Sequence, residues 1–107
     1  MDAFELDQVA AARREAGTAY HQFLNAGSLS AGLYVLPAGA EDVQEPHAED
    51  EVYYVLAGRA NLRVGNDDRA VGPGSLVFVG AAQSHRFHTI TEELSLLVFF
   101  APEHRQG

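Results

Sequence analysis

The stretch that decides the fold is AGAEDVQEPHAEDEVYYVLAG, residues 38–58. It begins as an acidic run around a single histidine, His47, and continues without a break into the apolar residues VYYVL. In a β-strand alternate side chains point to the same face, so His47, Glu51, Tyr53 and Val55 share one side. Tyr53 and Val55 are typical core residues. We therefore expect this side to point inward, with His47 and Glu51 at the mouth of the core.

The rest of the chain repeats this pattern of short apolar runs and turn residues. After Gly17 about eight such runs follow one another, each bounded by Gly, Pro, Asn or Asp, with no helical pattern between them. The segments VGNDDRAV and VGPGS are strong turn signals. The pattern predicts an all-β sandwich or barrel.

The first residues have a different, helical period. Asp2 is a candidate N-cap with Glu5 three positions later, and Gly17 is a candidate stop, so we expect a short helix over residues 2–16. The chain then divides into a helical N-terminal appendage, a β-barrel domain and a flexible tail, which we place at residues 1–17, 18–101 and 102–107.

Composition excludes several classes of function. A chain of 107 residues makes one domain, and its net charge of −8, with arginine as its only base, argues against a nucleic-acid partner. Without cysteine there is no disulfide and no thiolate ligand. No signal peptide or membrane segment is evident, so we expect a cytoplasmic protein with no membrane partner. Abundant alanine and glycine without lysine suggest a bacterial source.

A second stretch, GPGSLVFVGAAQSHRFHTI, also places a histidine at the start of an apolar strand, as the opening stretch does. Its SLVFV reads as a buried strand, GAAQ as a turn, and His85 opens the next strand with Phe87 on the same face. A buried carboxylate such as Glu51 is costly unless it is paired or bound to a cation. We therefore expect a metal ion near His47, Glu51 and His85. The other acids of the loop are expected to be solvated: Glu41, Asp42, Glu49 and Asp50.

These residues carry a resemblance to the cupin superfamily. The spacing Gly39-x5-Glu45-x-His47-x3-Glu51-x6-Gly58 is similar to the first cupin motif, G-x5-H-x-H-x3,4-E-x6-G, with Glu45 in place of its first histidine. The second motif, G-x5-P-x-G-x2-H-x3-N, is similar to residues 74–89. There Gly74 and His85 are kept, and the proline, second glycine and asparagine are replaced by Gly80, Ala82 and Thr89.

The resemblance implies a double-stranded β-helix, the jelly-roll barrel of small cupins, with one divalent metal ion inside. Carried over by position, His47, Glu51 and His85 are metal ligands, and Glu45 stands where the family has a fourth ligand. Two histidines and one carboxylate resemble the facial triad of non-haem iron sites. The added charge of Glu45 favours Mn²⁺ or Fe²⁺, with Zn²⁺ and Ni²⁺ as alternatives.

The remaining aromatic residues and histidines are expected to have ordinary roles. Aromatic side chains could line a pocket over the metal, namely Tyr53, Phe78, Phe87 and Phe99. Outward apolar residues on the strands favour a homodimer, namely Tyr34, Tyr54 and Leu56. Three histidines are expected to lie away from the site: His21, His88 and His104.

Three functions stay open from the sequence. The first is a metal-dependent enzyme acting on a small molecule, an oxygenase, isomerase or lyase, with Glu45 as catalytic base if it does not bind the metal. The second is a non-catalytic module that binds or senses a small molecule. The third is a structural cupin whose site has degenerated, as the replacements Glu45, Gly80, Ala82 and Thr89 would allow.

Overall fold

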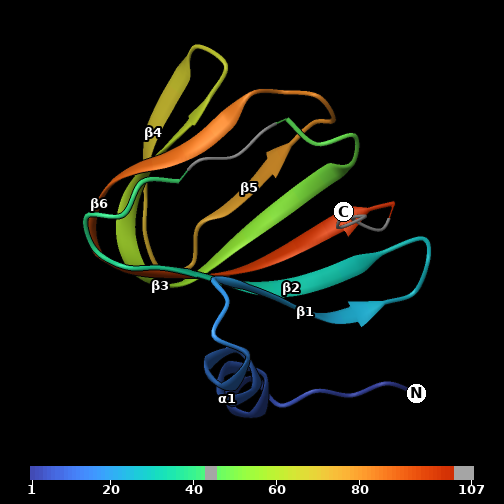
Figure 1. The fold of residues 1–107 in the computed structure, drawn as a ribbon. Helices are drawn as coiled ribbons and strands as arrows, with labels where there is room; N and C mark the ends of the chain where they lie inside the picture. The colour runs from blue at the N-terminus through green and yellow to red at the C-terminus, as the bar shows by residue number, and fades with distance from the viewer. Residues whose placement is uncertain (43–45, 103–107) are drawn as a thin grey trace.

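The computed structural model describes residues 1–42 and 46–102. Within these ranges the chain forms one helix and six strands (Figure 1). In chain order they are α1 (Leu6–Ala16), β1 (Tyr20–Asn25), β2 (Ser30–Leu36), β3 (Asp50–Val64), β4 (Asp67–Val71), β5 (Leu76–Val79) and β6 (His85–Ala101).

Helix α1 is shorter than the sequence predicted. It begins at Leu6, and Glu5 is its N-cap in extended conformation, so the expected capping box between Asp2 and Glu5 does not form. The residue before this cap, Phe4, packs its ring edge-on against Phe23 of β1 at 5.1 Å. This apolar contact fixes the direction in which the chain enters the helix. Gly17 ends the helix as predicted, in left-handed conformation and with its N–H directed at the last carbonyls.

The strands form one antiparallel sheet in the order β1-β2-β6-β3-β4, and β5 pairs with β3 on a separate branch. Figure 1 shows that β3 and β6 are both long and bent, so that their two halves belong to opposite walls of a barrel. The sequence predicted separate strands for these halves. That prediction was wrong, because Gly58 in β3 and the polar residues between the apolar runs of β6 bend each strand without ending it.

The bends reverse which side chains point inward. In the first half of β3 the odd-numbered Tyr53 and Val55 are buried, whereas in the second half the even-numbered Leu62 is. The pairing with β6 shifts between Val55 and Asn61, which is the signature of bulges. Gly58 lies there with a φ of +93° and its backbone packs against Glu93, leaving no room for a Cβ atom. The bend therefore requires glycine.

Strand β6 makes the same reversal near Thr89. His85 and Phe87 are buried on odd positions, and from Ile90 to Phe100 the buried positions are even. Thr89 has a φ of 51°, a left-handed conformation that threonine rarely adopts. A one-residue slip exchanges the two faces of a strand. The irregularity thus allows His85 and the distant Phe100 to face the same interior.

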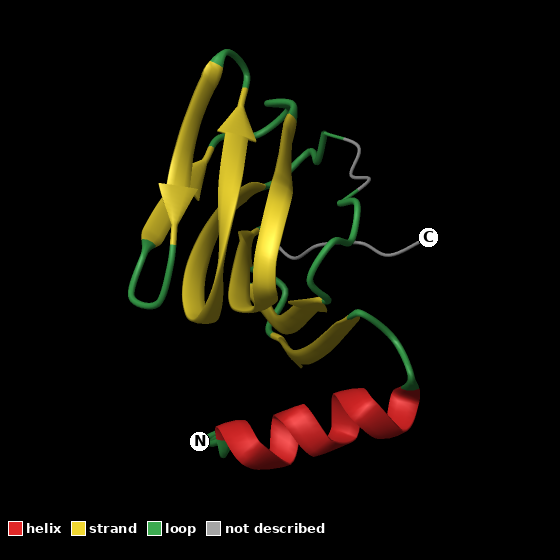
Figure 2. Cartoon of the chain, turned by 90° about the vertical axis from the view of Figure 1, so that its left-hand side faces the viewer, coloured by secondary structure: helices red, strands yellow, loops and turns green. Residues whose placement is uncertain are grey.

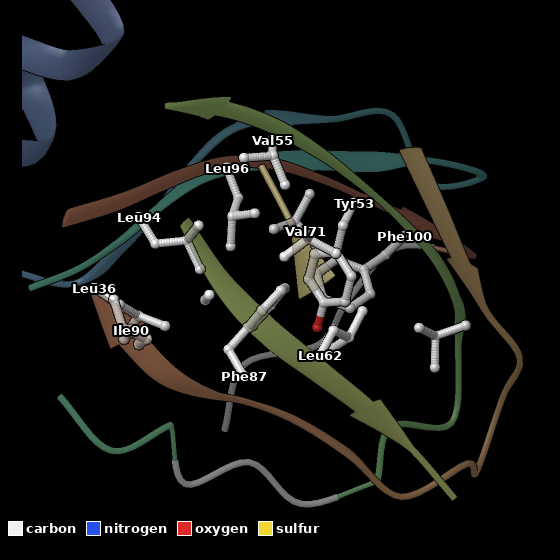
Figure 3. Close-up of a cluster of buried hydrophobic side chains, with 13 residues drawn as sticks. Leu36, Tyr53, Val55, Leu62, Val71, Phe87, Ile90, Leu94, Leu96 and Phe100 are labelled. Carbon is white, nitrogen blue, oxygen red and sulfur yellow. The ribbon is translucent and has the colours of Figure 1, made fainter. Parts of the chain in front are cut away.

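The core fills this interior (Figure 3). Tyr53, Phe87 and Phe100 converge from different strands, and Tyr53 and Phe87 pack edge-on at 4.9 Å. Two expected orientations are corrected. Phe78 of β5 is 65% exposed on the outer face, so it lines no interior pocket, whereas Tyr34 packs against the core.

Helix α1 lies outside the barrel next to β1 and β2 (Figure 2). Val9 of the helix and the outward Ala31 and Leu33 of β2 are buried there, apart from the main core. No helix among the described residues has the length and apolar character needed to span a membrane.

Candidate metal centre

Three of the predicted ligands meet at one end of the barrel. Each of His47, Glu51 and His85 offers one ligand atom, and these three atoms lie within 4.8 Å of one another. Glu51 is the second residue of β3, His85 is the first of β6, and His47 lies in the segment before β3. The fourth predicted ligand and candidate base, Glu45, lies outside the described residues.

Backbone and side-chain hydrogen bonds hold together the two segments that carry the predicted ligands. The N–H of Ala82 donates to the carbonyl of His47 at 2.6 Å, and the N–H of Ala81 donates to Oδ1 of Asp50 at 2.8 Å. The turn before β6 is thereby tied to the start of β3. Asp50 is exposed, as expected, but it anchors this turn.

His85 and Glu51 form a buried pair. Nε2 of His85 is 2.8 Å from Oε1 of Glu51, and each side chain is only 1% exposed. Nδ1 of His85 lies 2.9 Å from the carbonyl of Gln83, which can only accept, so Nδ1 carries a proton. Nε2 then faces the Glu51 carboxylate. Because both atoms are acceptors when unprotonated, their close approach requires either a second proton or a cation next to them.

The electrostatics of His85 follow from this geometry. Burial lowers the pKa of His85, but the bond to Glu51, the bond to the Gln83 carbonyl and the negative charges of Glu51 and Asp42 outweigh it. The net effect raises the pKa above its usual value. Without a metal, His85 is therefore favoured as an imidazolium paired with Glu51.

The cluster satisfies the chemical requirements of a divalent cation site. Oε2 of Glu51 is buried and makes no hydrogen bond to any described residue, and Nε2 of His85 is buried against Oε1 of the same carboxylate. Buried polar atoms without partners are rare, and imidazole with carboxylate is a donor set for Mn²⁺, Fe²⁺, Zn²⁺ or Ni²⁺. The residues present therefore fit a metal ion.

Aromatic side chains surround the cluster. The ring of His47 lies 5.5 Å from that of His85 and packs edge-on against Phe100 at 5.4 Å, and the ring of Tyr53 lies 6.0 Å from His85. Of the predicted pocket residues, Tyr53 and Phe87 are inside the barrel. Phe100, which the sequence did not single out, is the phenylalanine in contact with His47.

Asp42 corrects another expectation. It was predicted to be a solvated loop residue, yet it is 4% exposed. Its Oδ1 accepts from the hydroxyl of Tyr34 at 2.7 Å and its Oδ2 from the N–H of Phe87 at 2.8 Å. These two donors offset the cost of burying the carboxylate. Because Phe87 follows His85 by two residues, Asp42 also holds the strand that carries His85.

The other histidines lie apart from the cluster as far as they are described. Nε2 of His88 contacts the carboxylate of Asp68 at 2.9 and 3.0 Å, and its Nδ1 faces the hydroxyl of Thr89 at 3.0 Å. His21 is half-buried on β1 and does not join the cluster of predicted ligands. His104 lies outside the described residues.

Comparisons with known proteins agree with this fold. The family profile described as "Cupin domain" matches residues 32–100. An uncharacterized protein of Streptomyces coelicolor is 49% identical over 102 residues, covering 95% of this chain and 97% of that protein. A cupin-family protein of Methanocaldococcus jannaschii, described as a double-stranded β-helix, superposes with a TM-score of 0.71 at 18% identity, covering 78% of each chain.

One relative is an enzyme. Dimethylsulfoniopropionate lyase DddQ of Ruegeria pomeroyi is 34% identical over 74 residues, which are 68% of this chain but only 37% of the lyase. Its crystal structure superposes with a TM-score of 0.72 at 24% identity, covering 87% of this chain and 52% of the lyase. The match over residues 32–100, together with the antiparallel barrel, shows that this chain belongs to the cupin domain family and has its double-stranded β-helix fold.

Proposed function

We propose that this cupin binds one divalent metal ion through His47, Glu51 and His85 and acts there on a small molecule. The observation that carries the proposal is the convergence of three ligand atoms within 4.8 Å, two of them on nearly fully buried side chains. A bound ion would supply a Lewis acid with coordination positions open to substrate.

The chain's own residues would prepare this site in two ways. The Gln83 carbonyl fixes the tautomer of His85, so that Nε2 is the atom offered to a metal. The rings of Phe100 and Tyr53 border the histidines and restrict water. A substrate bound at the metal would therefore meet a largely aromatic wall, with the Tyr53 hydroxyl among its polar groups.

An enzyme is the function we favour, with lyase, isomerase and oxygenase chemistry as the candidate classes. The similarity to the lyase DddQ supports this choice. Glu45 remains our candidate for the base that removes a substrate proton or for a fourth ligand. The first substrate to test is dimethylsulfoniopropionate, followed by other small carboxylic acids, with turnover compared before and after metal removal.

A metal-free structural cupin is the second candidate. The 2.8 Å pair between His85 and Glu51 supports it, because an imidazolium and a carboxylate can neutralise each other without a cation. Metal content separates the two candidates.

We expect wild-type protein to hold about one divalent metal ion per chain after loading and desalting. His47→Ala, Glu51→Gln and His85→Ala should each lose most of it, because each removes one donor from the cluster. His88→Ala is the matched control, since His88 pairs with Asp68 away from the cluster, and it should keep the metal. Elemental analysis measures the content.

Equal metal content in the wild type and all three ligand variants would reject the site, and wild type without metal under every loading condition would favour the structural cupin. Glu45→Gln addresses the fourth ligand: we expect weaker binding if Glu45 coordinates and unchanged binding if it does not.

We further propose a homodimer. The outer face of β5 exposes Leu76 by 68% and Phe78 by 65%, and neither is covered by helix α1. Register places Leu76 opposite Tyr54 and Phe78 opposite Val52, which extends this apolar surface onto β3.

A further inference from the structure

A pocket lies close to the candidate metal centre but on a different surface. It has a volume of about 250 Å³, and its lining residues are Arg63, Gly65, Ser84, His85 and Arg86. Arg63 and Arg86 are exposed and alternate along their strands with the buried Leu62 and Phe87, so both arginines belong to the outer face. We call this the arginine pocket.

The two arginines form a cross-strand pair of like charge. Arg63 and Arg86 are direct partners in the register of β3 and β6. In such a pair the Cβ atoms are about 4.5–5.5 Å apart, and like charges directly opposite destabilise the sheet. An anion placed between the two guanidinium groups would turn this repulsion into attraction.

Protein carboxylates do not neutralise the pair within residues 1–42 and 46–102. No ion pair joins Arg63 or Arg86 to an acid there, and the Nε of Arg63 donates only a long 3.4 Å bond to the carbonyl of Gly65. Asp68 is the register partner of Arg63 on β4, but its carboxylate is engaged by His88 at 2.9 Å.

The charge of the pocket contrasts with that of the whole chain. The protein carries a net charge of −8 and has only seven arginines and no lysine, yet two of these arginines line this one pocket and no acid among the described residues does. Guanidinium groups bind carboxylate and phosphate through paired hydrogen bonds, and Ser84 adds a hydroxyl that can donate.

We propose that the arginine pocket binds a small oxyanion, a carboxylate or a phosphate, between Arg63 and Arg86. The site is separate from the metal centre, because the His85 side chain is turned toward Glu51 and is only 1% exposed. His85 and Arg86, at the start of β6, nevertheless line the pocket. A bound anion would therefore stabilise the start of the strand that carries a predicted metal ligand.

The test uses full-length, metal-free protein at low ionic strength, where counterions compete least. Inorganic phosphate and malonate are titrated separately by calorimetry. We expect saturable binding of at least one of them. The anion with the higher affinity shows whether the pocket prefers a phosphate or a carboxylate. Arg63→Gln and Arg86→Gln should each weaken it by about tenfold or more, as expected for loss of a charge-assisted hydrogen bond. Arg63→Lys should also weaken it, since lysine cannot bind in a bidentate manner.

Arg69→Gln is the matched control, because Arg69 is an exposed arginine on the neighbouring β4 that does not line the pocket. It should keep wild-type affinity. His47→Ala should also keep it, which separates this proposal from metal binding. If neither anion binds saturably, or if Arg69→Gln loses as much affinity as the pocket variants, the arginine pocket is not a binding site. Thermal unfolding of each variant confirms that it is folded.

Discussion

At the scale of single residues, Ala82 has a backbone conformation that favours glycine. Its φ is 64°, and its N–H donates the 2.6 Å bond that holds the His47 carbonyl. The second cupin motif has glycine at this position. The substitution in this chain therefore keeps the turn and the hydrogen bond while adding strain from the Cβ atom.

Replacing this alanine should stabilise the protein. We expect Ala82→Gly to raise the free energy of unfolding by about 1 kcal/mol, because relief of the left-handed strain outweighs the extra entropy of unfolded glycine. Urea denaturation measures the change. Ala81→Gly is the control: Ala81 is not among the residues with positive φ, so glycine there should be neutral or destabilising. A destabilised Ala82→Gly variant would contradict the expectation.

The His85–Glu51 pair predicts a pH dependence of stability in the metal-free protein. The pKa of His85 is raised in the folded state, so the pair contributes fully at pH values below the usual histidine pKa. This contribution is lost as the pH rises through the folded-state pKa. The melting temperature should therefore fall from slightly acidic to alkaline pH, and His85→Gln should lack this slope.

Metal binding should show the opposite dependence, because a metal ion must displace the proton from Nε2. Its affinity should rise with pH, and calorimetry in buffers of different ionisation enthalpy should detect proton release. The prediction for the metal-free protein has its own test. If its melting temperature rises with pH, with the same slope in His85→Gln, the stabilising His85–Glu51 pair is contradicted.

At the scale of elements, Asp42 connects three parts of the barrel. It lies in the segment after β2, accepts from Tyr34 of β2, and accepts from the backbone of Phe87 in β6. Burial, together with the charge of Asp42 and the hydrogen bond to it, raises the pKa of Tyr34 and keeps its hydroxyl protonated as the donor. The start of β6, which carries His85, is thus held by an acid far from it in sequence.

We expect Asp42→Ala to lower the free energy of unfolding by about 2–4 kcal/mol, since it leaves two buried donors without their charged acceptor. Metal affinity should fall as well, because β6 loses its anchor two residues from His85. Asp42→Asn should be milder, as it retains one acceptor. Glu41→Ala, at the neighbouring exposed position, is the control and should change neither measurement. Denaturant unfolding and metal titration measure the two effects. If Asp42→Ala lowers neither the free energy of unfolding nor the metal affinity, Asp42 is a solvated residue after all.

At the scale of the whole molecule, helix α1 covers only part of the outer surface. It packs on β1 and β2, whereas Leu76 and Phe78 of β5 remain exposed. An apolar surface of this kind is typical of protein interfaces.

We expect the wild type to elute as a dimer in size-exclusion chromatography with light scattering, against a chain mass of 11.6 kDa. Phe78→Glu should shift it to the monomer, because a charge would be buried in the interface. Phe4→Ser is the control, since the partly exposed Phe4 packs beside the helix rather than on β5. A wild-type monomer, or a dimer unaffected by Phe78→Glu, would contradict the proposed interface.

Local patterns in the sequence were sufficient for the class of fold, and the motif spacing was sufficient for the three residues that meet at one end of the barrel. Short apolar runs with Gly- and Pro-rich turns indicated an antiparallel barrel, and His47, Glu51 and His85 were placed together by their position at strand starts and by motif spacing. The class of fold depends on neighbours within a few residues, so a linear pattern carries it. The meeting of His85 with His47 and Glu51 joins distant parts of the chain, and the resemblance to the two cupin motifs is what predicted it.

The tertiary structure alone decided which faces point inward along the bent strands, that Asp42 is buried, and that Phe78 is exposed. Alternation predicts a face only within an uninterrupted strand, and the irregularities at Gly58 and Thr89 exchange the faces of β3 and β6. Asp42 is buried because its two donors come from β2 and β6, and Phe78 is exposed because no described segment covers β5. Such contacts join residues distant in the chain, and no local pattern records them.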